Sequence, residues 1–170
     1  AFQLDIWNKI KSINILRKDF YMSKLNFSIV IDAPISKVWD TMLEDKTYRI
    51  WTEEFSPGSH YIGNWNQGSK ILFLGPSNDG KIAGMVSRIK ENKLHKYISI
   101  EHLGEVYDGV EDTTSDRVKV WAGALENYTF INKDGKTELV VDLDINEEFK
   151  EMFEGMWPKA LQTLKSLCEE

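Results

Sequence analysis

Three side chains in the second half of the chain have the types needed for acid/base chemistry. Glu126 and Tyr128 are two residues apart, and His102 continues the spacing of Ile98 and Ile100. Side chains two apart on a strand share one face. A carboxyl group removed from water has its pKa raised toward neutrality, which is how general acids are tuned. Glu126, Tyr128 and His102 are therefore the candidate catalytic residues.

The orientation of these side chains has two solutions. In the first, Glu126 faces inward with the even-numbered positions Val118, Val120, Ala122, Ala124, Tyr128 and Phe130. In the second, Glu126 faces solvent and the inward residues are Trp121, Leu125 and Ile131. A bulge near Gly123 would switch the phase along the strand. His102 is likewise either a residue at a pocket mouth or a structural histidine bonded to a loop.

Other catalytic constellations are not indicated. The histidines His60, His95 and His102 lack the close spacing of metal ligands, and Cys168 is the single cysteine. The chain has no Gly-x-Ser-x-Gly elbow and no phosphate-binding glycine motif. The acidic loop 104–117 lacks the spacing of a calcium loop, which favours a solvated loop, and its glycines and length also suit a flexible lid near a cavity entrance. We expect no metal and no cofactor.

Composition limits the class of protein and its partners. The chain has 170 residues, of which 42% are hydrophobic and 28% are charged, as in an ordinary globular protein. It has no apolar run long enough for a membrane span and no signal-like N-terminus, which favours a cytoplasmic location without a membrane span. The net charge of −6 argues against nucleic acid as a partner.

Aromatic content is the most unusual feature. Six Trp, six Tyr and eight Phe make up 12% of the chain, and aromatic side chains typically line small-molecule pockets. The ten residues that we expect around such a pocket are Trp39, Trp51, Phe55, Trp65, Phe73, Trp121, Tyr128, Met152, Met156 and Trp157. Simple filling of the core is the alternative for each of them.

The chain divides near its start. Residues 1–21 place Phe2, Ile6, Ile10, Ile13 and Phe20 at helical spacing and carry a net charge of +2, which leaves −8 for residues 22–170. We expect an amphipathic helical extension over 1–21, either an upstream segment or an addition to the natural chain, that precedes a single ligand-binding domain over 22–170. A homodimer is left open.

Hydrophobic periodicity predicts an α+β fold for residues 22–170. A strand over 25–32 precedes helices over 35–44 and from 45 to the break at 57–58. Six strands follow, over 60–63, 69–74, 82–90, 96–103, 118–131 and 137–145. Asn146 caps a long final helix, which Pro158 and Gly155 should kink or restart. The prediction is a seven-stranded curved antiparallel sheet that wraps around this helix.

The order of elements carries a family resemblance. Six motifs occur in the matching order: Asp32–Asp40 at the first strand-to-helix join, Ile50-Trp51, Gly63–Ser69, Glu126–Phe130, Asp134–Leu139 and Trp157–Leu161. Together they resemble the START or SRPBCC superfamily, which has the helix-grip fold and includes the birch-pollen allergen. Within it they are most similar to the branch of the activator of the heat-shock-protein-ninety ATPase. The resemblance covers residues 25–170.

The resemblance implies a cavity between the sheet and the final helix that takes lipids or other apolar or aromatic molecules. Binding of such a molecule without catalysis is the leading hypothesis. A polyketide-cyclase-like or dehydratase-like enzyme is the first alternative, with Glu126, Tyr128 or His102 as acid/base. A co-chaperone with a heat-shock ATPase as its partner is the second, and the lack of a further activator domain argues against it. Fold alone does not decide among them.

Overall fold

The computed structural model describes residues 22–170, and the extension predicted over 1–21 lies outside the described residues. The described residues form one eight-stranded sheet with only antiparallel pairings. Its strands are β1 (Met22–Ile31), β2 (His60–Gly63), β3 (Lys70–Pro76), β4 (Ile82–Lys93), β5 (Tyr97–Tyr107), β6 (Val110–Asp112), β7 (Leu125–Lys133) and β8 (Lys136–Asn146). The spatial order is β1-β8-β7-β5-β4-β3-β2, and β6 adds to β5.

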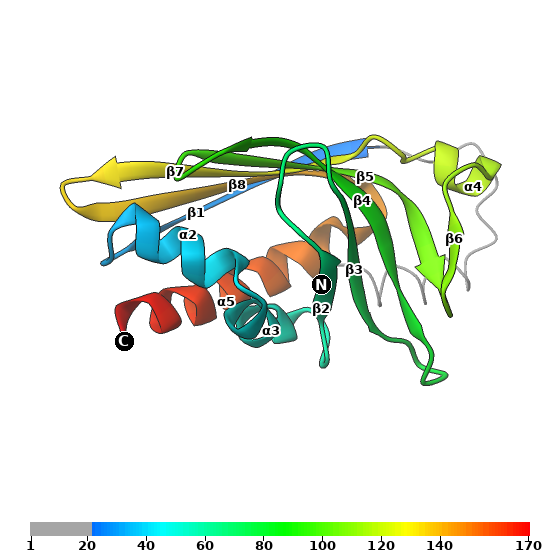
Figure 1. Cartoon of the computed structure of the whole chain (residues 1–170), viewed down its shortest axis with the longest axis horizontal. Helices are drawn as coiled ribbons and strands as arrows, with labels where there is room; N and C mark the ends of the chain where they lie inside the picture. The colour runs from blue at the N-terminus through cyan, green and yellow to red at the C-terminus, as the bar shows by residue number, and fades with distance from the viewer. Residues whose placement is uncertain (1–21) are drawn as a thin grey trace.

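The helices α2, α3 and α5 lie on one face of this curved sheet (Figure 1). In chain order the helical segments are α2 (Ile35–Leu43), α3 (Asp45–Trp51), the 3-10 turn η1 (Thr52–Glu54), α4 (Asp116–Lys119), the 3-10 turn η2 (Glu147–Phe149) and α5 (Lys150–Glu169). The long helix α5 packs against β1, α2, α3 and η1. This arrangement is the helix-grip fold, and it confirms the predicted fold class.

Alternating apolar residues explain the strands next to α5. Leu25 and Ile31 of β1 are buried, and Leu139, Val141, Leu143 and Ile145 of β8 are buried as predicted. The two strands pair along their whole length, from Met22 opposite Asn146 to Ile31 opposite Thr137. Because the period is two, alternate residues of the two strands share one face and join the core, whereas Val30 of β1 is on the other face and exposed.

The final helix differs from its prediction in two details. Asn146 accepts a hydrogen bond from the backbone N–H of Glu148, but it caps η2, and α5 begins only at Lys150. The helix then runs unbroken through Pro158, so the predicted restart is wrong. Pro158 and Glu154 are both exposed, so water can satisfy the carbonyl group that the proline leaves without an amide donor.

The segment before β7 is the main correction to the prediction. Residues 118–124 were expected to be strand, but α4 and a turn occupy them, and Gly123 lies in that turn with φ of 93°. The reason is local. Asp112 accepts from the backbone N–H groups of Thr114 and Ser115, and the Ser115 side chain accepts from that of Val118. These bonds end one strand and start a helix, so Val120 and Ala122 are exposed and not inward.

The sheet has eight strands and not seven because part of the acidic loop is β6. Tyr107 pairs with Val110 across the two-residue turn Asp108-Gly109, and both turn residues have positive φ, 49° and 79°. Asp-Gly is the preferred sequence for such a hairpin turn. The predicted flexible lid is therefore a hairpin followed by α4. Arg117 of α4 holds it to the sheet through the buried carboxylate of Glu105.

Candidate functional site

Four polar side chains on three neighbouring strands meet inside the molecule. Ser87 of β4 lies opposite His102 of β5, and Ile100 of β5 lies opposite Glu126 of β7. Tyr128 follows Glu126 on the same face. Ser87, His102, Glu126 and Tyr128 are exposed by 0%, 6%, 4% and 2%. The inward phase of β7 is thus the one adopted, and we name these four residues the polar cluster.

Contacts connect the polar cluster from end to end. Ser87 Oγ lies 2.8 Å from His102 Nδ1, and His102 Nε2 lies 3.4 Å from Glu126 Oε1. The Tyr128 hydroxyl donates to Glu126 Oε2. Since His102 Nε2 faces a carboxylate, we assign the ring proton to Nε2, so that Nδ1 accepts from the Ser87 hydroxyl. All three donors then point along the cluster toward Glu126.

The negative charge of Glu126 affects two buried tyrosines, Tyr48 and Tyr128. Tyr48 of α3 is buried, and its pKa is raised well above the ordinary value, first by burial and then by the negative charge of Glu126. The pKa of Tyr128 is raised well above its ordinary value for the same two reasons in the same order. Both phenols therefore keep their protons at neutral pH, and Tyr128 donates its proton to Glu126.

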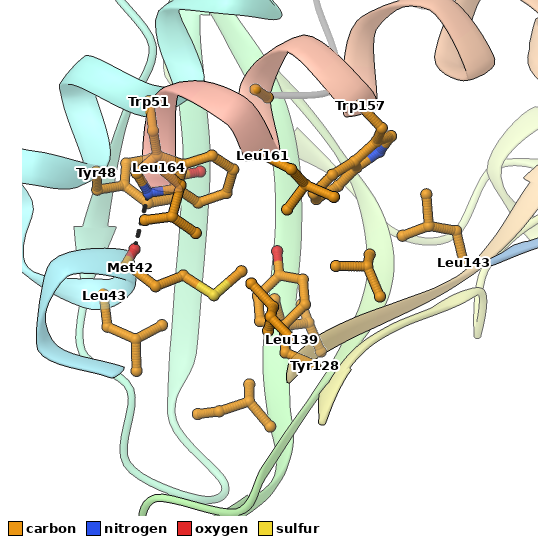
Figure 2. Packing of buried hydrophobic residues seen from close by; sticks show 14 of the residues in the cluster. Met42, Leu43, Tyr48, Trp51, Tyr128, Leu139, Leu143, Trp157, Leu161 and Leu164 are labelled. Carbon is orange, nitrogen blue, oxygen red and sulfur yellow. Dashed lines mark hydrogen bonds between the residues drawn. The ribbon is translucent and has the colours of Figure 1, made fainter. Parts of the chain in front are cut away.

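Aromatic rings flank the polar cluster on both sides. The ring of Phe73 lies 6.3 Å from that of His102, and the ring of Trp157 lies 6.4 Å from that of Tyr128. Trp157 also contacts Phe55 at 4.9 Å and Trp51 at 6.1 Å. Figure 2 shows Trp157 and Leu161 of α5 facing Tyr128, whose hydroxyl points away from the sheet toward the helix.

Six of the ten predicted pocket residues belong to this aromatic surrounding or to its contacts. They are Trp51, Phe55, Trp65, Phe73, Tyr128 and Trp157. Tyr48 connects several of them, because its ring lies 6.2 Å from Phe73, 6.3 Å from Trp65 and 5.5 Å from Trp51. The rings therefore form one continuous group around the polar cluster.

The other four predicted residues lie in different places. Trp39 is buried against Phe130 and His95, with ring centroids 5.0 and 5.7 Å apart. Met152 and Met156 are half-buried on α5 and pack on the core. Trp121 lies half-buried in the turn after α4, outside that main core. Trp121 was predicted on a strand over 118–131, but the strand begins only at Leu125.

Two residues of the site were not predicted from the sequence. Ser87 shares one face of β4 with buried Ile89, but its place opposite His102 depends on the register of β4 against β5, which shifts at Val86/Ser87 and cannot be read from alternation alone. Tyr48 of α3 is not among the ten residues predicted around the pocket. A buried tyrosine usually needs a polar partner, and this was the signal available for it.

Two other kinds of site have no counterpart among the described residues. Within residues 22–170, no three histidine, cysteine, aspartate or glutamate side chains gather as a metal site would require. In the same range, no helix has the length and apolar character needed to cross a bilayer.

Comparison with known proteins finds the same fold in other structures but does not assign a function. The chain matches no protein-family model, and no curated protein is detectably similar to it in sequence. Solved structures do match. One from Cytophaga hutchinsonii has 18% identity and a TM-score of 0.65, covering 89% of this chain and 96% of its own. One from Rhizobium loti has 10% identity and a TM-score of 0.66, covering 88% and 99%.

A third match, from Nitrosomonas europaea, has 11% identity and a TM-score of 0.64 and covers 89% of this chain and 96% of its own. At such low identities the three structures share the fold of this chain and nothing more specific. The function must be argued from the polar cluster and its aromatic surroundings.

Proposed function

We propose that the protein binds an apolar or aromatic small molecule between the sheet and α5, with its polar end at the polar cluster. The observation that carries this proposal is the burial of Ser87, His102, Glu126 and Tyr128 among aromatic rings. Replacing buried polar networks by apolar residues is often neutral or stabilising, so folding alone gives little reason to keep one. Apolar walls with a few convergent polar groups are the usual build of a ligand site.

We also propose that the chain is a member of the START or SRPBCC superfamily. The support is the order of the six sequence motifs together with the helix-grip fold. Two motifs supply parts of the site: Glu126–Phe130 provides the carboxylate and its tyrosine, and Trp157–Leu161 provides the ring that packs over them.

The test is binding of 2-naphthol by isothermal titration and by thermal shift, because a molecule that binds only the folded state raises its melting temperature. Trp157→Phe should weaken binding by about tenfold, since it removes part of the aromatic wall. Trp39→Phe is the matched control, because Trp39 is also buried but packs against Phe130 and His95. Equal effects of the two variants, or no binding to the wild type, would reject the proposal.

A dehydratase is the second candidate, and the convergence of His102, Glu126 and Tyr128 is the observation that favours it. In such a reaction the substrate hydroxyl leaves as water with a proton from the cluster, and the proton from the neighbouring carbon returns to the cluster. The test is conversion of 4-hydroxy-4-phenylbutan-2-one to its conjugated ketone, followed by ultraviolet absorbance. Absence of turnover, or turnover that survives Glu126→Gln, would exclude this role for the cluster.

A further inference from the structure

The donors of the polar cluster point to acceptors within the cluster, but not all of its acceptor positions are used. The Ser87 hydroxyl is directed to His102, the Nε2 proton of His102 faces Glu126, and the Tyr128 hydroxyl donates to Glu126. A carboxylate offers about four acceptor positions, and these contacts use two of them. The phenolic oxygen of Tyr128 can also accept a bond. A ligand that reaches the cluster would therefore find hydrogen-bond acceptors there, on Glu126 and Tyr128.

The described residues give Glu126 no buried lysine or arginine as a partner. Among residues 22–170, the buried ionisable side chains include Glu126, Glu105 and His102 but no lysine or arginine. Arg117, which pairs with Glu105, has a half-exposed side chain on α4. An anion that entered beside Glu126 would therefore find no buried lysine or arginine of residues 22–170 to compensate it.

From this geometry we infer that the site selects ligands whose polar end is a hydrogen-bond donor, a hydroxyl or an amine, and that it rejects carboxylates. This inference rests on the proposed function and deepens it by naming the ligand class. The donor would bond to Glu126 while the apolar part of the ligand lies against the rings of Phe73 and Trp157. Fatty acids and other apolar acids are thereby excluded.

The preference for a donor follows from the cost of leaving a buried acceptor unpaired and of placing two carboxylates together. A site that hydrogen-bonds a hydroxyl strongly rejects an analogue without it, because the buried acceptor is left unpaired. A carboxylate ligand fares worse, because two carboxylates in one site cannot both stay ionised. We expect at least about a tenfold preference for the donor over either competitor.

The experiment compares three naphthalenes of similar shape on the full chain near neutral pH. The first, 2-naphthol, has a donor; 2-methoxynaphthalene has an ether in its place; 2-naphthoate has a carboxylate. Isothermal titration should give a dissociation constant for 2-naphthol that is at least about tenfold below the other two. Equal binding of all three would overturn the inference and leave the proposed function standing. No binding of any of them would overturn both.

Two glutamine variants locate the selection. Glu126→Gln should reduce the preference for 2-naphthol over 2-naphthoate by about tenfold, because it removes the charge and adds a donor. Glu105→Gln is the matched control, since Glu105 is also buried on the sheet but is paired with Arg117. The Glu105→Gln protein should keep the wild-type preference for 2-naphthol over 2-naphthoate. A preference that persists in Glu126→Gln would overturn the assignment. If that variant does not fold, the wild-type ranking of the three probes decides.

Discussion

The proposed site depends on Glu126, and burial of its charge costs free energy that hydrogen-bond donors must offset. It is 4% exposed, and the contacts that compensate it come from Tyr128 and His102. The sequence placed Glu126, Tyr128 and His102 as a group but left open whether Glu126 faces inward. The answer depends on which residue of β5 lies opposite it, Ile100, and pairing between distant segments is not encoded in a local pattern.

Removing the bond from Tyr128 should expose that cost. Tyr128→Phe is expected to lower the free energy of unfolding by about 1–3 kcal/mol, because a buried charge loses a donor. Urea denaturation measures this change. Tyr97→Phe, on a half-buried tyrosine of the same sheet, should change the stability by less than about 0.5 kcal/mol. A Tyr128→Phe protein as stable as the wild type would show that Glu126 does not need this donor.

The elements show where reading by periodicity succeeds and where it fails. Strands β1 and β8 were predicted closely because one face of each is buried, which enforces strict alternation. The stretch before β7 misled because Val118 and Val120 alternate with polar residues inside a capped turn of helix. The Asp108-Gly109 turn and the Ser115 cap were readable signals for β6 and α4, and both are local.

Two glycines test the packing of the elements in opposite directions. A side-chain carbon at Gly84 would overlap the backbone of Phe73 on β3, so Gly84→Ala should cost more than about 2 kcal/mol. Gly155 on α5 has no atom within 4 Å of such a carbon, so Gly155→Ala should gain about 0.5–1 kcal/mol from helix propensity.

Thermal and urea denaturation of both glycine variants gives the signs directly. A stable Gly84→Ala protein would contradict the close approach of β3 and β4 that positions Phe73 beside His102. A destabilised Gly155→Ala protein would contradict an open, regular α5 at this point.

For the whole molecule, the fold could be predicted and the function could not. Element order and apolar patterning predict a sheet closed by a terminal helix, because these features are local and repeated along the chain. The polar cluster draws Ser87, His102 and Glu126 from three strands and faces Tyr48 of α3, so it exists only once the sheet is assembled. The net charge of −6 adds a long-range preference against anions to the local one at Glu126.

Alkaline pH should destabilise the protein through its two buried phenols. The pKa values of Tyr48 and Tyr128 in the folded protein are raised well above 10.0, their value in the unfolded chain. Their contribution to stability is therefore complete below about pH 10 and falls as the pH rises above it, because the unfolded chain loses protons that the folded protein retains. Urea denaturation from about pH 8 to 11 should show a shallower loss of stability for Tyr128→Phe than for the wild type. Parallel curves would contradict the burial of this phenol.

The most direct test of the central claim is a crystal structure of the protein with 2-naphthol. We predict that the naphthalene ring lies between the sheet and α5, near Phe73 and Trp157, with its hydroxyl within hydrogen-bond distance of a Glu126 carboxylate oxygen. A ligand bound only at the surface, or an interior unchanged by the ligand at saturating concentration, would contradict the claim.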